Sequence, residues 1–277
     1  MSFSVASLGS GSRGNAFLLE TDDTRLLVDA GFSGTQLARR LEALEVDHES
    51  LDGVVVTHEH RDHTAGIGIG ARRWGWPLYM SRGTAGACRT LLRGQERVHG
   101  LRAGEALQIG SLTVDPVLTC HDAADPVAVT ITDARTCLKV GVATDLGRPT
   151  MHVRQALQGC AFVVLESNHD ERLLREGPYP WSVKQRIGGS RGHLSNRLAG
   201  EFAEELMHPR LGGVLLAHLS AECNDPERAR DRVGESLDRV GYQGLLDVAA
   251  QGEPSPRYDV EEVTRAGAQS PQLSFFP

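Results

Sequence analysis

Apolar and polar positions follow two different periods along the first part of the chain. Residues 2–9 and 16–31 alternate between apolar and polar side chains, and the second run contains an Asp-Asp pair typical of a hairpin turn. Residues 33–44 begin with a serine N-cap and then repeat apolar residues at helical spacing. Residues 52–60 start with an apolar run that ends in histidines. The pattern predicts antiparallel strands, then a helix, then a buried strand.

Helical and strand patterns continue to alternate through most of the chain. We expect further helices at residues 64–74, 83–92, 150–158, 194–207 and 225–239, and further strands at 77–81, 108–120, 125–133, 136–145, 161–167, 212–218 and 244–251. The apolar faces of these elements must be buried, and two facing sheets with helices on their outer sides meet this need. We predict an α/β fold, an αββα four-layer β-sandwich over residues 1–251.

Composition and charge narrow the class of protein. No apolar stretch reaches eighteen residues and the first residues contain no basic leader, so we expect a cytoplasmic protein without a membrane segment. The five cysteines form no CxxC pair, which argues against a disulfide framework or a thiolate zinc site. The net charge is −7, yet residues 61–102 carry eight arginines against two acids, and residues 172–197 carry six basic residues against one acid. These stretches either contact phosphate or are solvated helix faces.

Candidate metal ligands lie where predicted strands end. Residues 58–63 hold three histidines and an aspartate in the pattern HxHxDH, in which alternate side chains of a turn can converge. His121, Asp145 and His218 each follow the end of another strand, so the sheets can carry them to the same edge. Imidazole and carboxylate donors together suit Zn, Mn or Fe. The sequence therefore predicts a metal site at this edge.

These motifs resemble those of the metallo-β-lactamase superfamily over nearly all of residues 1–250. The resemblance implies the metallo-β-lactamase fold and a hydrolase with two divalent metal ions, Zn or Mn, which activate a water between them. The implied ligands are His58, His60 and His121 for one ion, Asp62, His63 and His218 for the other, and Asp145 for both. Asp62 is also an expected catalytic residue, and Asp29, which matches the first motif of the superfamily, is expected to orient a loop that carries ligands.

Four further stretches narrow the resemblance to one family. They are SLGSGSRGNA near the start, LESNHD at residues 165–170, GPYPWSVKQRIGGSRGHLSN at 177–196 and AHLSAECND at 217–225. Together they resemble the bacterial YycJ (WalJ) family of metallo-β-lactamase-fold 5′ to 3′ DNA exonucleases. This resemblance implies a phosphodiester hydrolase that acts on DNA in repair. Only 72 residues separate Asp145 from His218, too few to house a β-CASP insertion as well as the expected strands and helices.

The same stretches contain candidate proton-transfer and substrate residues. His193 and Glu166 resemble the histidine and glutamate that tRNase Z-type phosphodiesterases place beside the metals, which implies His193 as general acid and Glu166 as its orienting partner. A histidine at a helix N-terminus that contacts only backbone is the alternative for His193. His169, Asn196 and Asn224 are expected to contact substrate. Cys223 departs from the paired asparagines of the family and weakens any role of its loop beyond Asn224.

Three other functions remain open from the sequence alone. A small-molecule or cyclic phosphodiesterase shares the HxHxDH pattern and also lacks β-CASP. An RNA-processing nuclease of the same fold needs the same ligands. A non-catalytic adaptor needs only the fold as a docking surface, and the intact ligand set argues against it. The arginine-rich stretches favour a DNA substrate modestly, because a small phosphate ester also binds arginine.

The end of the chain carries a separate expectation. Residues 252–277 are rich in Pro, Ser, Gly and Glu, so we expect a mostly flexible tail with at most a short strand at 257–260. The side chains of Gln272, Leu273, Phe275 and Phe276 resemble the QLSLF-type peptide by which bacterial DNA-repair proteins dock on the sliding clamp. Such a peptide fills an apolar cleft with its apolar side chains. Packing of the two phenylalanines on the enzyme itself is the alternative.

Overall fold

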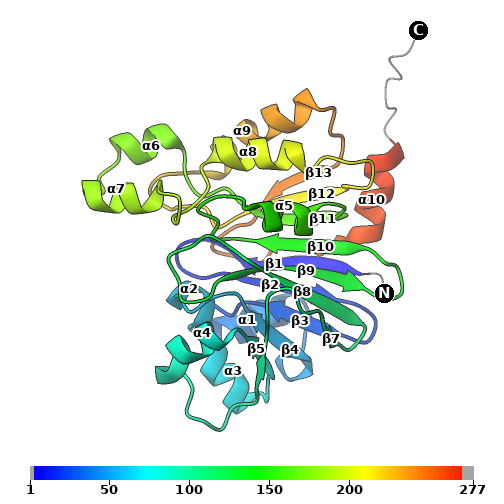
Figure 1. The fold of residues 1–277 in the computed structure, drawn as a ribbon. Helices are drawn as coiled ribbons and strands as arrows, with labels where there is room; N and C mark the ends of the chain where they lie inside the picture. The colour runs from blue at the N-terminus through cyan, green and yellow to red at the C-terminus, as the bar shows by residue number, and fades with distance from the viewer. Residues whose placement is uncertain (1–2, 270–277) are drawn as a thin grey trace.

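Two seven-stranded sheets face each other at the centre of the molecule, and helices cover their outer sides (Figure 1). The computed structural model describes residues 3–269. The first sheet has the strand order β14-β1-β2-β3-β4-β5-β6, and the second has the order β13-β12-β11-β10-β9-β8-β7. This arrangement confirms the predicted αββα sandwich.

The strands of the first sheet change from antiparallel to parallel pairing along the sheet. They are β1 (Ser4–Gly9), β2 (Ala16–Glu20), β3 (Arg25–Val28), β4 (Gly53–Val56), β5 (Leu78–Met80), β6 (Val98–Gly100) and β14 (Tyr258–Asp259). Hairpins join β1 to β2 and β2 to β3, whereas β3, β4, β5 and β6 run parallel. Parallel neighbours end at the same edge of a sheet, so loops that follow them meet there.

The second sheet combines an antiparallel and a parallel half in the same way. Its strands are β7 (Leu107–Ile109), β8 (Leu112–Leu118), β9 (Val127–Asp133), β10 (Lys139–Ala143), β11 (Phe162–Glu166), β12 (Gly213–Ala217) and β13 (Leu245–Val248). Strands β10, β11, β12 and β13 are parallel.

Three apolar layers hold the sandwich together. Phe17 and Phe162 belong to the fully buried layer between the sheets. Leu37 belongs to the layer between the first sheet and its helices, and Phe202 and Leu237 belong to the layer between the second sheet and its helices. Helices α1, α8 and α9 therefore bury the apolar stripe that the sequence predicted.

Helices lie in two groups on the outer sides and a pair lies at one end of the molecule (Figure 1). The first sheet is covered by α1 (Gly34–Ala43), α2 (Arg61–Thr64), α3 (Ile67–Arg73) and α4 (Arg82–Ala87), and the second by α5 (Met151–Leu157), α8 (Asn196–Glu205) and α9 (Pro226–Arg239). Two short helices that the sequence pattern did not indicate, α6 (Glu171–Glu176) and α7 (Trp181–Ile187), project beside them. In the described chain, none of the helices is long and apolar enough to span a bilayer.

The segment after residue 251 differs from the expectation of a mostly flexible tail. Strand β14 pairs with β1, and helix α10 (Val260–Gln269) follows it directly. Val260 is fully buried in the layer between the sheets, and the Tyr258 hydroxyl donates to Asp247 Oδ2 at 2.7 Å. Strand β14 lies within residues 257–260, where a short strand was expected. The expectation of a flexible tail is wrong for residues 260–269, because a few apolar side chains at helical spacing outweigh a polar composition. Residues 272–276, which carry the clamp-like peptide, lie outside the described residues.

Candidate metal centre

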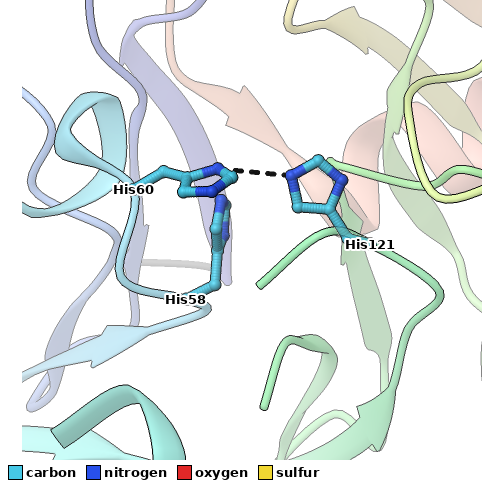
Figure 2. A group of neighbouring side chains, drawn as sticks. All are labelled: His58, His60 and His121. Atoms are coloured by element: carbon cyan, nitrogen blue, oxygen red, sulfur yellow. Dashed lines mark hydrogen bonds between the residues drawn. The ribbon is translucent and has the colours of Figure 1, made fainter. Parts of the chain in front are cut away.

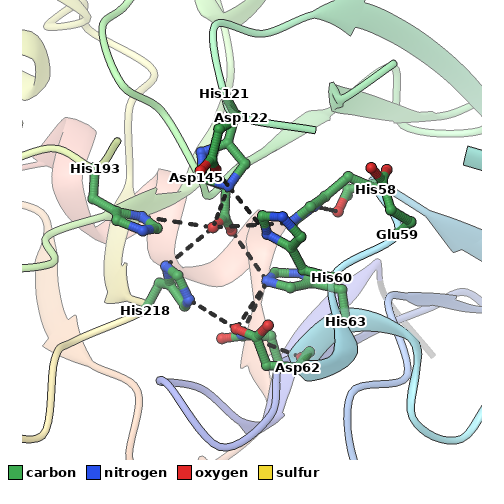
Figure 3. A network of polar contacts seen from close by, with 12 residues as sticks. His58, Glu59, His60, Asp62, His63, His121, Asp122, Asp145, His193 and His218 are labelled. Carbon is green, nitrogen blue, oxygen red and sulfur yellow. Dashed lines mark hydrogen bonds and ion pairs between the residues drawn. The ribbon is translucent and has the colours of Figure 1, made fainter. Parts of the chain in front are cut away.

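The predicted ligands meet at one edge of the sandwich (Figure 3). Strand β4 leads into His58 and His60, and helix α2 carries Asp62 and His63. His121, Asp145 and His218 come from the second sheet, where they follow β8, β10 and β12 respectively. Seven residues from the two sheets thus converge at this edge. This convergence was predicted from their positions at the ends of strands.

The backbone at this edge is strained at three positions. Asp29, Asp145 and His218 have φ values of 64°, 57° and 56°, in the left-handed region that residues other than glycine rarely adopt. Such conformations persist only where the surrounding structure enforces them, and they concentrate at functional sites. Here Asp145 and His218 turn side chains into the cluster, and Asp29 turns its side chain to the back of His63, each within two residues of a strand end.

The first group of donors is formed by His58, His60 and His121 (Figure 2). His121 Nε2 lies 3.3 Å from His60 Nδ1, and the donor atoms of all three lie within 4.8 Å of one another. His58 Nε2 is buried and has no hydrogen-bond partner among the described residues. A buried nitrogen without a partner is costly unless something binds it, so this group fits a metal ion.

Hydrogen bonds behind the rings set which nitrogen faces the cluster. His121 Nδ1 lies 3.0 Å from the Gly192 carbonyl, which can only accept, so this nitrogen carries the proton. Thr57 Oγ1 donates to Asp29 and lies 3.0 Å from His58 Nδ1, whose N–H it can accept. In both rings Nε2 is left as a lone-pair donor toward the cluster, the form that a metal requires.

The second group of donors is formed by Asp62, His63 and His218. Asp62 Oδ2 lies 3.2 Å from His218 Nε2 and 3.4 Å from His63 Nε2. Asp29 Oδ2 accepts from His63 Nδ1 at 2.7 Å, and Thr57 anchors the same carboxylate through its amide at 2.8 Å. Asp29 therefore holds His63 from behind and is also bound by Thr57, which immediately precedes the ligand turn that it was expected to orient.

Asp145 lies between the two groups. Its Oδ2 is 3.1 Å from His63 Nε2, and its Oδ1 is 3.4 Å from His121 Nε2 and 4.0 Å from His58 Nε2. It is almost fully buried. A single carboxylate that reaches both groups can bridge two cations, which is the position that the resemblance implied.

The loop between β1 and β2 contributes two residues that the sequence analysis did not assign. Asn15 Nδ2 lies 3.2 Å from His63 Nε2 and 3.4 Å from Asp62 Oδ2. Ser10 Oγ donates to Asn15 Oδ1 at 2.7 Å and accepts from the His218 amide at 2.8 Å. The stretch SLGSGSRGNA was visible as a motif, but only the fold shows that its polar side chains join the two sheets at the site.

One glycine behind the cluster is required by close packing. A Cβ built on Gly31 would lie 1.7 Å from the Asp62 carbonyl oxygen, far inside van der Waals contact. The Asn15 amide also donates to this carbonyl at 2.8 Å. Gly31 thus lets the turn that carries Asp62 pack directly on the preceding loops.

The electrostatics of the cluster favour cations. Burial lowers the pKa of His58 well below its ordinary value, so this ring is neutral at neutral pH. Burial also opposes charge on His218, but the nearby Asp145 and Asp62 outweigh it and raise the pKa of that ring to about 10. A site where carboxylates attract protons this strongly is one where divalent cations can take their place.

Glu166 holds two histidines at once. Its Oε1 lies 2.8 Å from His193 Nδ1 and 2.8 Å from His218 Nδ1. Its Oε2 accepts the backbone N–H groups of Leu146 and Leu194, both at 2.9 Å. The carboxylate is fully buried, and despite that burial the hydrogen-bonded His193 holds its pKa down at about 2. Glu166 therefore fixes a candidate ligand as well as its expected partner.

His193 faces open space beside the cluster. We call this space the metal-side hollow; its volume is about 400 Å³, and Asp62, Asp145, His193 and His218 line it. Burial opposes a proton on His193, but Glu166 outweighs it and raises the pKa of the ring above its ordinary value. His193 therefore contacts more than backbone, because its Nδ1 is held by a carboxylate.

The three expected substrate residues do not line the metal-side hollow. His169 lines a neighbouring hollow, considered below. Asn196 and Asn224 donate to each other's side-chain oxygens at 2.8 Å, and Ser167 provides further partners to both. Asn196 is buried. Their amides are thus used inside the protein, where they tie the start of α8 to the loop before α9, and the geometry does not support the expected substrate contact.

Known proteins with similar sequences and structures carry the same fold. The model of the beta-lactamase superfamily domain matches residues 24–218. Exodeoxyribonuclease YycJ from Bacillus anthracis is 34% identical over 87% of this chain and 90% of its own length. Exodeoxyribonuclease WalJ from Streptococcus pneumoniae is 33% identical over 82% of this chain and 85% of its own. The structure of the metallo-beta-lactamase fold protein YhfI from Bacillus subtilis has a TM-score of 0.70 at 21% identity, covering 92% of this chain and 99% of that one.

Fold and site together define a metal-dependent hydrolase of the metallo-β-lactamase fold. The chain belongs to the metallo-β-lactamase superfamily and, within it, to the family of the YycJ and WalJ exodeoxyribonucleases. The His and Asp cluster and these relatives support a nuclease or phosphodiesterase that uses divalent metal ions. Residues 146–217 form α5, β11, α6, α7, α8 and β12, which occupy the interval where a β-CASP insertion would stand.

Proposed function

We propose that the protein is a 5′ to 3′ DNA exonuclease that acts in DNA repair and uses two divalent metal ions, Zn or Mn. The observation that carries the proposal is the placement of Glu166, which holds both the candidate ligand His218 and the candidate proton donor His193 through one oxygen. This couples a proton donor to a two-cation site, which is the combination that phosphodiester hydrolysis needs. The relatives named exodeoxyribonucleases support DNA as the substrate.

The donor set fits two cations. One group holds His58, His60 and His121, the other holds Asp62, His63 and His218, and Asp145 reaches both. When bound, the metal ions activate a water for attack on phosphorus and neutralise the developing negative charge. Asp62 is the most open of the carboxylates in the cluster, since a quarter of its side chain is exposed, so it can orient that water from the hollow.

His193 supplies the proton for the leaving oxygen. Its Nδ1–H is donated to Glu166, which leaves Nε2 to face the substrate. Because Glu166 is anchored by two backbone amides, the pair keeps one geometry through the reaction. The raised pKa of His193 favours the protonated ring, the form that a general acid requires.

Arginines offer phosphate contacts on the approach to the site. Arg61 and Arg186 line the metal-side hollow. Arg186 is paired with Asp122 at 2.6 Å and is two-thirds exposed, so a phosphate can compete for it. Such contacts bind the backbone of nucleic acid without reading its sequence and weaken as salt rises.

End-labelled substrates test the proposal. Metal-loaded protein is incubated with DNA labelled at either end, with RNA of the same sequence and with a chromogenic phosphodiester. We expect early release of mononucleotides from the 5′ label of DNA and slow loss of the 3′ label. Preference for RNA would identify the protein as an RNA-processing nuclease. Turnover of the chromogenic ester alone would identify it as a small-molecule phosphodiesterase. Either result overturns the proposal.

We also propose that Gln272, Leu273, Phe275 and Phe276 bind the sliding clamp. Helix α10, which leads toward this peptide, lies at the end of the sandwich away from α6 and α7 (Figure 1). The candidate site lies at the other end, beside those two helices, as their residues in the metal-side hollow and its neighbour indicate. Docking through the peptide would leave the site open to DNA and raise its local concentration.

A further inference from the structure

A second hollow meets the metal-side hollow at His193, which lines both. It has a volume of about 490 Å³ and we call it the α6–α7 hollow, because residues of those helices form much of its wall. A third hollow shares Ser12, Arg61 and Asp62 with the metal-side hollow. The metal-side hollow thus adjoins both of the others.

The α6–α7 hollow combines an aromatic ring with positive charge. Trp181, at the start of α7, lines it and is 70% exposed, more than the other large apolar side chains of the described chain. Leu174 and Leu198 form apolar wall, and Lys184 and Arg175 add two cations. An exposed tryptophan beside cations is the arrangement on which proteins stack a base next to a phosphate.

A buried polar atom in the same wall lacks a partner. His169 is 3% exposed, lines the hollow, and its Nδ1 has no hydrogen-bond partner among the described residues. The carboxylate of Glu171, which also lines the hollow, is matched by Arg197 Nε at 3.1 Å and by the Ser195 hydroxyl at 2.9 Å. Because the Glu171 carboxylate is paired, the hollow does not strongly repel an anion. The Nδ1 atom of His169 remains available to hydrogen-bond a ligand.

Resting on the proposed nuclease function, we propose that the α6–α7 hollow binds the 5′-terminal nucleotide and releases it as a nucleoside 5′-monophosphate, with its base stacked on Trp181. The position of His193 places the leaving nucleotide in this hollow and the scissile phosphate at the metals, because a proton donor for the leaving oxygen must lie between the two. Water oxygen bonds to phosphorus, the bond from phosphorus to the 3′ oxygen breaks, and that oxygen takes a proton from His193. The shortened strand keeps a 5′-phosphate and remains a substrate.

Tryptophan fluorescence tests binding without any turnover. Of the three tryptophans, Trp74 is 8% exposed and Trp76 is fully buried, so an added nucleotide contacts Trp181. We expect dAMP and dTMP to quench the emission saturably and deoxyribose 5-phosphate to compete without quenching. Trp181→Ala loses the reporter ring, so its affinity is measured by calorimetry, and nucleotide binding should weaken on the order of tenfold. Met151→Ala removes a similarly exposed apolar side chain on α5 and should leave the quenching unchanged.

The contribution of the cations Arg175 and Lys184 is tested with a matched pair of arginines on α6. Arg175 lines the hollow and Arg172, on the same helix and similarly exposed, does not. Arg175→Ala and Lys184→Ala should weaken dAMP binding severalfold, and Arg172→Ala should not. Equal effects of Arg172→Ala and Arg175→Ala, or the absence of saturable quenching by dAMP, would overturn the inference.

An abasic 5′ end separates the inference from the function on which it rests. Wild-type protein should remove an abasic terminal nucleotide about tenfold more slowly than a normal one, and Trp181→Ala should remove both at the same slow rate. Hydrolysis of DNA with no preference for a terminal base would overturn the inference and leave the function intact. Saturable dAMP binding without DNA hydrolysis would overturn the proposed function and leave the α6–α7 hollow as a nucleotide-binding site.

Discussion

Asp29 Oδ2 accepts a hydrogen bond from His63 Nδ1 at 2.7 Å, and both side chains are fully buried. Asp29 reaches this position only through a left-handed backbone conformation directly after β3. The carboxylate keeps the ring proton on Nδ1 and leaves the lone pair of Nε2 facing the space between Asp62 and Asp145, where a cation would bind. A residue that touches no candidate metal position thus decides the protonation of a candidate ligand.

Asp29→Asn is expected to lower metal affinity about 10- to 100-fold. The Asn oxygen can keep the Thr57 contact, so its NH₂ group faces His63 and forces the ring proton onto Nε2. Competition with a chelator measures the loss. Asp133→Asn changes a buried aspartate that caps a turn away from the site and should leave the affinity unchanged. Equal affinity of Asp29→Asn and wild type would contradict this role.

Asp62→Ala and His121→Ala are each expected to abolish hydrolysis, because each removes a donor from a different group of the cluster. Metal content and turnover are measured together. Glu59→Gln is the matched control: Glu59 lies within the same motif, but it accepts from the Ala124 amide at 2.8 Å and points away from the cluster (Figure 3). Full activity of either alanine variant, with metal contamination excluded, would contradict the two-cation site.

His193→Ala is expected to lower turnover by roughly 10² to 10⁴, since a general acid contributes about that much. The metal content should not change. His99→Ala, which removes an exposed histidine that stacks on Tyr79, serves as control and should keep full activity. Loss of a metal ion from His193→Ala would show instead that this residue is a ligand.

Glu166→Gln is expected to move the alkaline limb of the activity profile to lower pH. His193 is raised in pKa by Glu166 against the effect of burial, and a general acid works only while protonated. Removal of the negative charge lowers that pKa, so activity is lost at a lower pH. Glu166 itself has a pKa of about 2 and stays ionised over the assay range. An unchanged alkaline limb would exclude His193 as the group that titrates there.

Deletion of residues 270–277 is expected to abolish association with the cognate sliding clamp and to leave hydrolysis of short DNA unchanged. The peptide spanning Ser270 to Pro277 should bind the clamp by itself, and replacement of Leu273 and Phe275 by alanine should prevent this binding. Calorimetry with the isolated peptide measures it. Clamp binding that survives the deletion would assign the contact to another surface.

Patterns local in the chain determined much of this protein. Periodicity predicted the helix that Ser33 caps and the strand that precedes His58, and both are present. The ligand histidines and aspartates follow strand ends, and parallel strands that end at one edge bring them together. These features depend on spacing within one segment, which the sequence contains in full.

The tertiary structure decided how distant residues pair. Asn15 reaches His63, and Glu166 reaches His218, because two sheets pack face to face and bring separate loops to one edge. The same packing places Val260 in the core, although its segment has the composition of a tail. A side chain's partner across many residues depends on sheet order and backbone conformation, and neither is encoded in the spacing of a single motif.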